Sequence, residues 1–529
     1  MNVGEVRRVP TALRAEHFEK LPARILDLNV IRRFRRDVTY FFVINAFRVS
    51  WGGRARFNMI PFAHVRLSIP RSHNMSKRER IKHQVCNAID ARREAIVKIG
   101  ESIMDAPELG FKEHRTAARV KKVFEEIGLP FEDDVAITGV KAVLRGAKAG
   151  PTVALMGELD ALQVPDHPRA CPDTGAAHAC GHNAQVAGLL GAAMGLTQVG
   201  VAEHLAGNVV FFAVPAEEYV EIGYRLGLVK QGRTSFLTGK QELIQLGHFD
   251  DVDMAIMIHS TSPDVSEGSM GLAPSSNGFL AKNIRFLGKA SHAGSFPERG
   301  VNALNAAQLA LSAINAQRET FRDEDCVRVH PIITKGGDLV NIVPAEVCLE
   351  TYVRAKTPDA ILDAANKVDR ALRGAALAMG CCVEIETVPG NLPMRNDPRL
   401  AELFRNNAGG LFGDDGYCEY PHAGGSTDAG DLSQLIPVLH PMMTGGSGSH
   451  HQSDWCIADF DAGYISPAKT LAMMAIDLLH DDAQEAREVL SSYVPAMTKD
   501  EYLNRQQSIF REESFDGTSS CDPLTSITS

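Results

Sequence analysis

Three apolar runs of strand length, each ending in polar side chains, constrain the fold of this chain most strongly. The runs are "TVALMGELDAL", "NVVFFAVPAEE" and "VDMAIMIHS", and helical stretches separate them, notably from Asn183 to Leu196. This alternation favours an α/β fold, with a mixed, mostly parallel sheet flanked by helices. Ligands bind beyond the carboxyl ends of such strands, so we expect the polar ends to meet in one crevice. These ends are Glu158 and Asp160, Glu217 and Glu218, and His259.

A second pattern runs from residue 277 to 392. Its order of strand and helix signals is β-α-β-β-α-β, with helices predicted over "GVNALNAAQLALSAINAQ" and "ILDAANKVDRALRGAALAMG". That order is typical of a ferredoxin-like α+β unit. We therefore expect one α/β domain of residues 75–276 plus 393–499, with residues 277–392 inserted into it as a small second domain.

The two ends of the chain differ from the rest. Residues 1–74 carry arginine clusters such as "IRRFRRD" and show no sustained period, whereas helical spacing begins at Met75. We expect this segment to be a disordered or wrongly assigned extension, and a mitochondrial presequence is disfavoured by its acidic residues. Residues 500–529 are expected to form a flexible tail.

Composition restricts the class of partner and compartment. The net charge of −10 gives no basic face for nucleic acid, and no apolar run is long enough to cross a membrane. The ten cysteines in 529 residues are too sparse for a disulfide framework. A cytoplasmic protein with neither nucleic-acid nor membrane partners is expected.

The stretch "TGAAHACGHNAQ" carries the first chemical signal. In an extended segment alternate side chains share a face, so Cys180 and His182 can point the same way, and His178 could join them. Thiolate and imidazole are good ligands for zinc and similar divalent ions. A buried cysteine flanked by hydrogen-bonded histidines would account for the same sequence pattern equally well.

Three other pieces point to the same chemistry. Glu217 and Glu218 are neighbouring carboxylates at a strand end, which a metal pair would offset, although a solvated turn would also fit. His259 follows an apolar strand, where a satisfied core histidine is common. A glycine-rich loop leads into His450 and His451, either of which could be a ligand. Together these pieces favour a metal site.

Several ordered motifs over residues 80–495 resemble the aminoacylase/carboxypeptidase superfamily of dinuclear metallopeptidases. They include "GELDAL", "HACGHN", "PAEE", "IHS", "LVNIVPAEV", "GGSTDAGD" and the late histidine loop. The nearest branch is similar to the amidohydrolases that include hippurate, indole-acetyl-amino-acid and aminobenzoyl-glutamate hydrolases. Asn183 and "GELDAL" depart from the commoner pattern of that branch and are closer to its aminobenzoyl-glutamate and dipeptidase-like subgroup.

The resemblance implies a role for each matching residue. The implied metal ligands are Cys180, His182, Glu218, His259 and His451, with His450 as the alternative to His451. Glu217 would be the general base and Asp160 would orient a ligand. From the inserted domain, His292, Asn341 and Arg354 would hold the substrate, with His292 reaching a neighbouring subunit.

The implied activity is hydrolysis of an amide bond in an N-acyl amino acid or dipeptide-like substrate. Two divalent ions per subunit would activate the water, with Zn or Mn expected and Co or Ni also compatible with mixed ligands. The resemblance implies that residues 75–276 plus 393–499 form the catalytic domain and that residues 277–392 act as a lid and dimerisation domain, so a homodimer through the inserted domain is expected. Two alternatives stay open: a cysteine hydrolase that uses Cys180 with His182 or His178, and a binding protein on a degenerate peptidase fold.

Overall fold

The computed structural model describes residues 75–264 and 267–518. The extension predicted for residues 1–74 therefore lies outside the described residues, as does the end of the chain from residue 519. No helix of the described ranges is long and apolar enough to cross a membrane.

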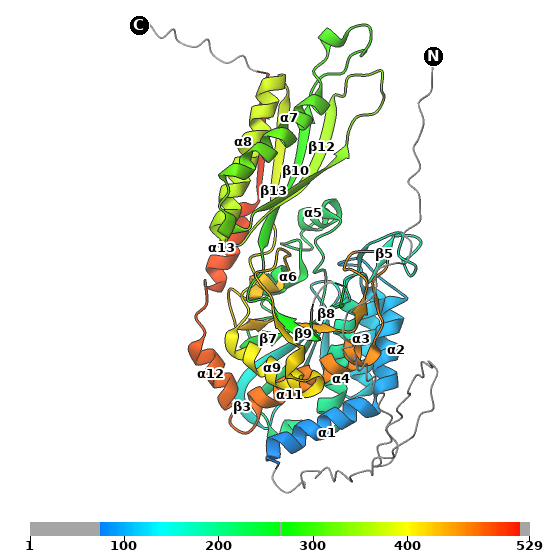
Figure 1. Ribbon diagram of the computed structural model, residues 1–529, viewed down its shortest axis with the longest axis vertical. Coiled ribbons are helices and arrows are strands. Elements are labelled where there is room, and N and C mark those ends of the chain that lie inside the picture. The colour runs from blue at the N-terminus through cyan, green and yellow to red at the C-terminus, as the bar shows by residue number, and fades with distance from the viewer. Residues whose placement is uncertain (1–74, 265–266, 519–529) are drawn as a thin grey trace, which may run out of the picture. The chain divides into compact units, whose positions relative to one another are not determined.

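A six-stranded mixed sheet forms the centre of the catalytic part, as predicted (Figure 1). Its inner strands are parallel to one another, because β3 pairs in parallel with β6 and β7, and β7 with β15. The two strands at the other edge, β1 and β2, are antiparallel. In spatial order the strands are β1 (Phe131–Val135), β2 (Gly139–Arg145), β6 (Ala206–Val214), β3 (Lys148–Glu158), β7 (Met254–Ile256) and β15 (Val438–Leu439).

The third predicted strand is divided in two. After β7 the chain leaves the large sheet, and β8 (His259–Thr261) pairs in parallel with β16 (Met442–Thr444). These two belong to a smaller four-stranded sheet with β9 (Met270–Leu272) and β14 (Tyr417–Glu419). His259 therefore begins a strand of the second sheet, where its backbone N–H donates to the carbonyl of Pro441 over 2.8 Å.

One buried helix, α4 (His182–Gln198), packs against the large sheet. Its small residues allow neighbouring helices to come close. A Cβ added at Gly191 would lie 2.8 Å from the Cβ of Ala468 and 3.0 Å from Ile96 Cδ1. The neighbours are α1 (Lys77–Ala91), α2 (Arg93–Met104) and α11 (Ser466–Leu479). The other helices of this part include α3 (His114–Glu126), α5 (Ile222–Lys230), α6 (Gly239–Leu246), α9 (Pro398–Phe412) and α12 (Gln484–Ser492).

The inserted part has the predicted β-α-β-β-α-β order. Its strands are antiparallel in the spatial order β11-β12-β10-β13, which is the ferredoxin-like arrangement. Helices α7 and α8 cover one face of this sheet with alanine-rich surfaces (Figure 1). The elements are β10 (Gly278–Leu287), α7 (Ala303–Ala316), β11 (Arg328–Lys335), β12 (Glu346–Ala355), α8 (Pro358–Met379) and β13 (Cys382–Pro389).

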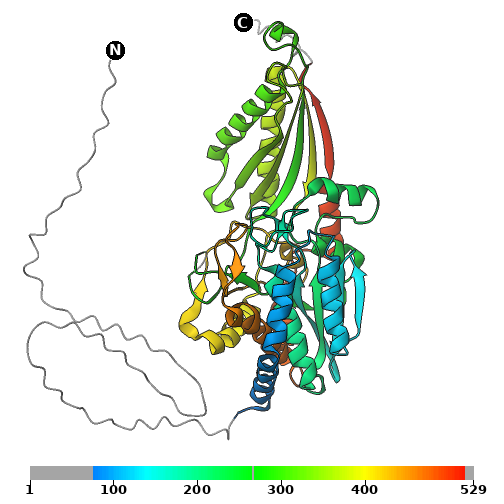
Figure 2. The same ribbon diagram turned by 90° about the vertical axis from the view of Figure 1, so that its right-hand side faces the viewer.

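The flexible tail predicted from residue 500 is wrong for its described part. Residues Lys499–Ile509 form α13 behind a capping box at Thr498, and Arg511–Asp516 form β19, which pairs with β13 as a fifth strand of the inserted sheet (Figure 2). The open edge of β13 supplies backbone partners that the polar composition of the segment did not reveal.

Helix α13 also contacts the catalytic part. Tyr502 Oη donates to Asp431 Oδ1 over 2.9 Å, and Gln506 Nε2 donates to the same oxygen over 3.0 Å. The chain thus passes between the two parts three times, close to residues 277, 390 and 510.

Candidate metal centre

The predicted polar strand ends converge. β3 ends at Glu158, the residues after β6 include Glu217 and Glu218, and β8 begins with His259. Glu158, Glu217 and Glu218 are all buried, at 1%, 9% and 8% exposure. Buried carboxylates in such number require positive charge nearby.

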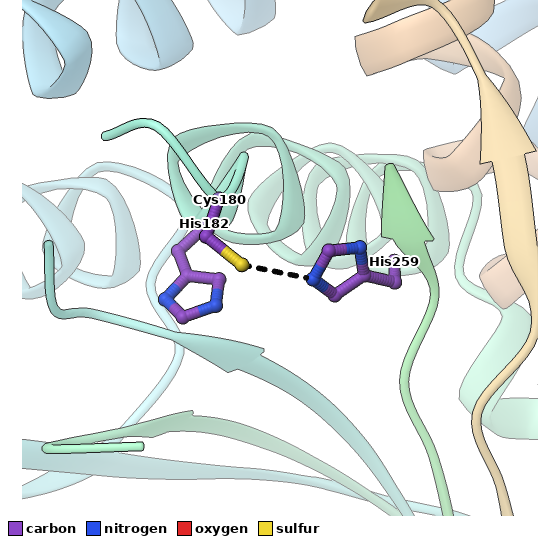
Figure 3. Close-up of side chains that lie close together, drawn as sticks. All are labelled: Cys180, His182 and His259. Carbon is purple, nitrogen blue, oxygen red and sulfur yellow. Dashed lines mark hydrogen bonds between the residues drawn. The ribbon is translucent and has the colours of Figure 1, made fainter. Parts of the chain in front are cut away.

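Cys180 and His182 lie at the N-terminus of α4, on either side of Gly181. This glycine has φ +90°, and a side chain there would come within 2.8 Å of Ser260 Oγ. The left-handed turn therefore lets Cys180 approach β8. Its sulfur lies 3.4 Å from His259 Nε2, and His182 lies on the same side of the turn (Figure 3).

Two triplets of potential ligand atoms share the sulfur of Cys180. Within each triplet the atoms lie within 4.8 Å of one another, and the triplets are Cys180, His182 and His259, and Cys180, Glu218 and His451. Neighbouring ligands of one ion lie about 3–3.7 Å apart. The distances of 3.4 Å from Cys180 Sγ to His259 Nε2 and 3.4 Å from Glu218 Oε1 to His451 Nε2 fit that range.

The structure distinguishes the two adjacent histidines of the late loop. His451 has a left-handed backbone, φ +62°, and its N–H donates to the carbonyl of Ala179, which turns its ring toward Glu218. His450 instead places Nε2 3.0 Å from the carbonyl of Ser260 and packs on Trp455. His178 is buried but belongs to neither triplet.

Asp160 contacts two residues of the cluster, His182 and Glu218. Its Oδ2 accepts the backbone N–H of Glu218 over 2.9 Å, and its carbonyl lies 2.9 Å from His182 Nδ1. With Nδ1 engaged, Nε2 is the nitrogen left for a metal. That buried Nε2 makes no hydrogen bond within the described residues, although Glu158 Oε2 is 3.0 Å away. The donor set thus fits a divalent ion.

The charges of the cluster act on one another. Burial and Glu218 oppose ionisation of the Cys180 thiol, but His182 and His259 hold its pKa well below the usual value. Burial raises the pKa of Glu217 well above its usual range, and the charges of Glu158 and Glu218 add to that effect. Glu217 is therefore a carboxyl group able to hold a proton, whereas the pKa of the neighbouring Glu218 is lowered despite its burial, chiefly by its hydrogen bond to His451.

The three implied substrate contacts of the inserted part divide into two sets. Arg354 reaches the catalytic part, where its Nη1 donates to Ser426 Oγ over 2.7 Å. His292 and Asn341 are exposed and adjacent, with Ala293 N–H donating to the carbonyl of Asn341, and neither lines the cavity at the metal centre.

A cavity of about 190 Å³ opens on the centre. Cys180, Glu217, Glu218, His259 and His451 lie in its wall. The remaining lining comes from residues such as Ser276, Met394, Ser426, Thr427 and His440. Sequence reasoning noted Glu158 without a role and missed Lys240 and His440. The motifs "GELDAL" and "GGSTDAGD" contain Glu158 and Asp428, but no motif marked Lys240 or His440.

Asn183, the departure noted in "HACGHN", is turned away from the centre. Its Nδ2 donates to Tyr464 Oη over 3.1 Å and to the carbonyl of Gly100 over 3.3 Å. The substitution therefore bears on the packing of α4 against α2, and not directly on the ligand set.

Comparison with known proteins gives the family. Residues 154–470 match the model of peptidase family M20/M25/M40. The chain is 29% identical to the Xaa-Arg dipeptidase of Mus musculus over 78% of this chain and 92% of that protein.

Solved structures share the fold. A putative aminohydrolase from methicillin-resistant Staphylococcus aureus matches with a TM-score of 0.61 and 21% identity, over 75% of this chain and 99% of that one. A dinuclear metal-binding peptidase from Bacillus subtilis matches with a TM-score of 0.56 and 22% identity, over 74% of this chain and 99% of that one.

The family match confirms the resemblance and the class of metal-dependent amide hydrolase predicted from the sequence, and it does not favour the cysteine hydrolase or the degenerate binding protein. The matched segment is 317 of 529 residues and runs from within β3 to within α11. The chain therefore belongs to peptidase family M20/M25/M40.

Proposed function

We propose that this hydrolase holds one divalent ion between Cys180, His182 and His259 and a second between Cys180, Glu218 and His451. The observation that carries the proposal is the position of the Cys180 sulfur, which belongs to both triplets. The buried thiol, whose pKa His182 and His259 already lower, would then have both ions as neighbours for its negative charge. Zn or Mn is the expected metal, and Co or Ni would also suit the mixed ligands.

Bound ions would supply a water of lowered pKa and polarise the amide carbonyl. Glu217 lies outside the two triplets that share Cys180, although it forms a third close group with Glu158 and His182. It lines the cavity, and we assign it as the carboxylate that takes the proton of the attacking water. Its raised pKa suits it to return that proton to the leaving nitrogen. Asp160 keeps His182 and Glu218 oriented during both transfers.

The proposed substrate is an N-acyl amino acid or a dipeptide. The cavity is small, and Arg354 provides a guanidinium beside it for a substrate carboxylate. The similarity to a protein named Xaa-Arg dipeptidase suggests a first panel of dipeptides ending in arginine. N-acetyl amino acids and aminobenzoyl-glutamate complete that panel, because other relatives are named for such substrates.

Two neighbouring glutamates provide the test. Glu217→Gln should abolish turnover, with a loss of at least about a thousandfold, while two metals per chain remain. Glu218→Gln should lose metal as well as activity. Metal analysis of both purified variants separates the roles. A Glu217→Gln enzyme that keeps a substantial rate would contradict the base assignment.

We also propose that two copies pair through the inserted part, so that His292 and Asn341 serve the partner's site. Apolar side chains are exposed around them, with Val340 at 102% and Leu339 at 60%. Mixing inactive His292→Ala with inactive Glu217→Gln should restore part of the activity in heterodimers. A monomer by analytical ultracentrifugation would contradict the pairing.

The cytoplasmic location stays a prediction. Its support is that the nine cysteines of the described residues are all free.

A further inference from the structure

A fully buried lysine lies behind the metal centre. Lys240 has 0% exposure, and its Nζ is 2.6 Å from Glu158 Oε1 and 2.5 Å from Asp428 Oδ1. Its backbone N–H donates to Asp428 Oδ2 over 2.9 Å. One cation therefore joins the end of β3, the start of α6 and the residue that precedes α10 (Ala429–Leu432).

On one side this network touches the metal centre. The other oxygen of Glu158 lies 3.0 Å from His182 Nε2 and accepts a hydrogen bond from Gln185 Nε2 over 2.8 Å. Glu158, His182 and Glu217 have donor atoms within 4.8 Å of one another. Any displacement of Glu158 would reach the ligand and the base together.

On its other side the network holds the wall of the cavity. Asp428 directly follows Ser426 and Thr427, which both line the cavity. Ser426 Oγ is also the acceptor for Arg354 of the inserted part. The position of Asp428 therefore fixes the loop that meets the substrate-side arginine.

We propose that Lys240 is a positioning residue for the hydrolysis, because its ammonium holds Glu158 against His182 and Glu217 and holds the Ser426–Thr427 wall of the cavity. Lys240 does not line the cavity and touches no reacting atom. The inference rests on the proposed function, since it concerns the arrangement of the groups assigned there.

A stabilising role alone would be a weak reason for this network. Buried ion pairs are often no more stable than apolar residues of similar volume. The protein also offers a matched control. Lys282 is equally buried, its Nζ lies 2.7 Å from Asp369 Oδ1, and it belongs to the inserted sheet away from the metal centre.

The test compares Lys240→Met with Lys282→Met in the full chain loaded with Co(II). We expect Lys240→Met to lower kcat tenfold to a hundredfold, the range seen when groups that orient metal ligands are removed. Its Co(II) absorption spectrum should also change, which a loss of stability alone would not cause. Lys282→Met should keep the wild-type spectrum and kcat. A Lys240→Met enzyme with wild-type spectrum, kcat and KM would overturn the inference.

Asp428→Asn keeps the test decisive if Lys240→Met fails to fold. This variant retains the pair of Lys240 with Glu158 and weakens only the hold on the cavity wall. We expect KM to rise at least threefold with a smaller fall in kcat, and unchanged KM and kcat would overturn the inference. A wild-type chain that binds no Co(II) or cleaves no amide would instead contradict the proposed function.

Discussion

The catalytic and inserted parts each bury one lysine completely, and the two are used differently. Lys240 forms ion pairs with Glu158 and Asp428, whereas Lys282 forms an ion pair with Asp369 and donates a hydrogen bond to the hydroxyl of Thr387. Asp369 also accepts a hydrogen bond from Arg511 of β19 over 2.6 Å. The first cluster has excess negative charge beside a cation site, and the second has excess positive charge.

The difference appears in the pKa values of the two lysines. Burial lowers the pKa of both, but Asp428 and Glu158 together raise the pKa of Lys240 above its usual value. For Lys282 burial prevails over the attraction of Asp369, Arg511 adds repulsion, and the pKa falls. Equal burial thus gives opposite shifts, because the number of partner carboxylates decides the sign.

The largest expected effect comes from removing each lysine. Lys240→Met leaves two buried carboxylates without a cation, whereas Lys282→Met leaves Asp369 with Arg511. Breaking a buried pair costs about 3–5 kcal/mol, and we expect Lys240→Met near the upper end and Lys282→Met near the lower. Urea denaturation measures both. Equal losses, or the reverse order, would contradict the comparison.

Metal removal should separate the two parts of the molecule. An ion present at about a hundred times its dissociation constant contributes about 2.7 kcal/mol to stability. Chelation should therefore increase hydrogen exchange at the start of α4 and around Glu217, while strands β10 to β13 stay unchanged. Exchange that rises equally in the inserted sheet would show that the parts are not independent.

Arg511→Gln tests the tie between β19 and the inserted core. A hydrogen bond to a charged group contributes about 1.5–3 kcal/mol, and the half-exposed Arg511 places the expected loss near the lower value. Arg285→Gln is the control, because Arg285 forms only exposed pairs with Glu346 and Glu384 on the same sheet. Its loss should stay below about 1 kcal/mol in thermal unfolding.

The smallest expected effect is a difference in pH dependence. Because the pKa of Lys240 is raised in the folded chain, its contribution to the free energy of unfolding is complete below the pKa of lysine in the unfolded chain. That contribution is lost as the pH rises from this value through the folded pKa. The stability gap between wild type and Lys240→Met should narrow above about pH 10.4. The pKa of Lys282 is lowered, so the difference in stability between wild type and Lys282→Met should widen as the pH rises toward that value. Each stability difference should change by at most about 1.4 kcal/mol per pH unit. Changes of the same sign for the two lysines would contradict the opposite directions assigned to their pKa values.

The architecture was predictable where burial follows a regular period. Strand β12 alternates between buried and half-buried residues along its whole length, and such alternation made the inserted unit recognisable. The convergence of Glu158, Glu217 and Glu218 also followed from parallel strand ends. Strand periodicity could not distinguish His451 from His450, because no sequence pattern indicates which of two adjacent histidines has the left-handed backbone that His451 adopts.

Lys240 and β19 illustrate what sequence patterns cannot show. A lysine at the start of a helix is normally exposed, and its two partners lie 82 and 188 residues away. Four of the six residues of β19 are charged, which indicates a solvated segment. Both features depend on long-range contacts that no local period encodes.

The fifth strand has a consequence for protein engineering. A fragment limited to residues 277–392 would expose the edge of β13 and deprive Asp369 of one of its two cations. The transplantable module is therefore discontinuous, and a graft or a minimal recombinant version needs the segment through Asp516 joined by a linker. A fusion partner joined directly after Asp516 would accordingly sit beside the inserted sheet and not beside the cavity.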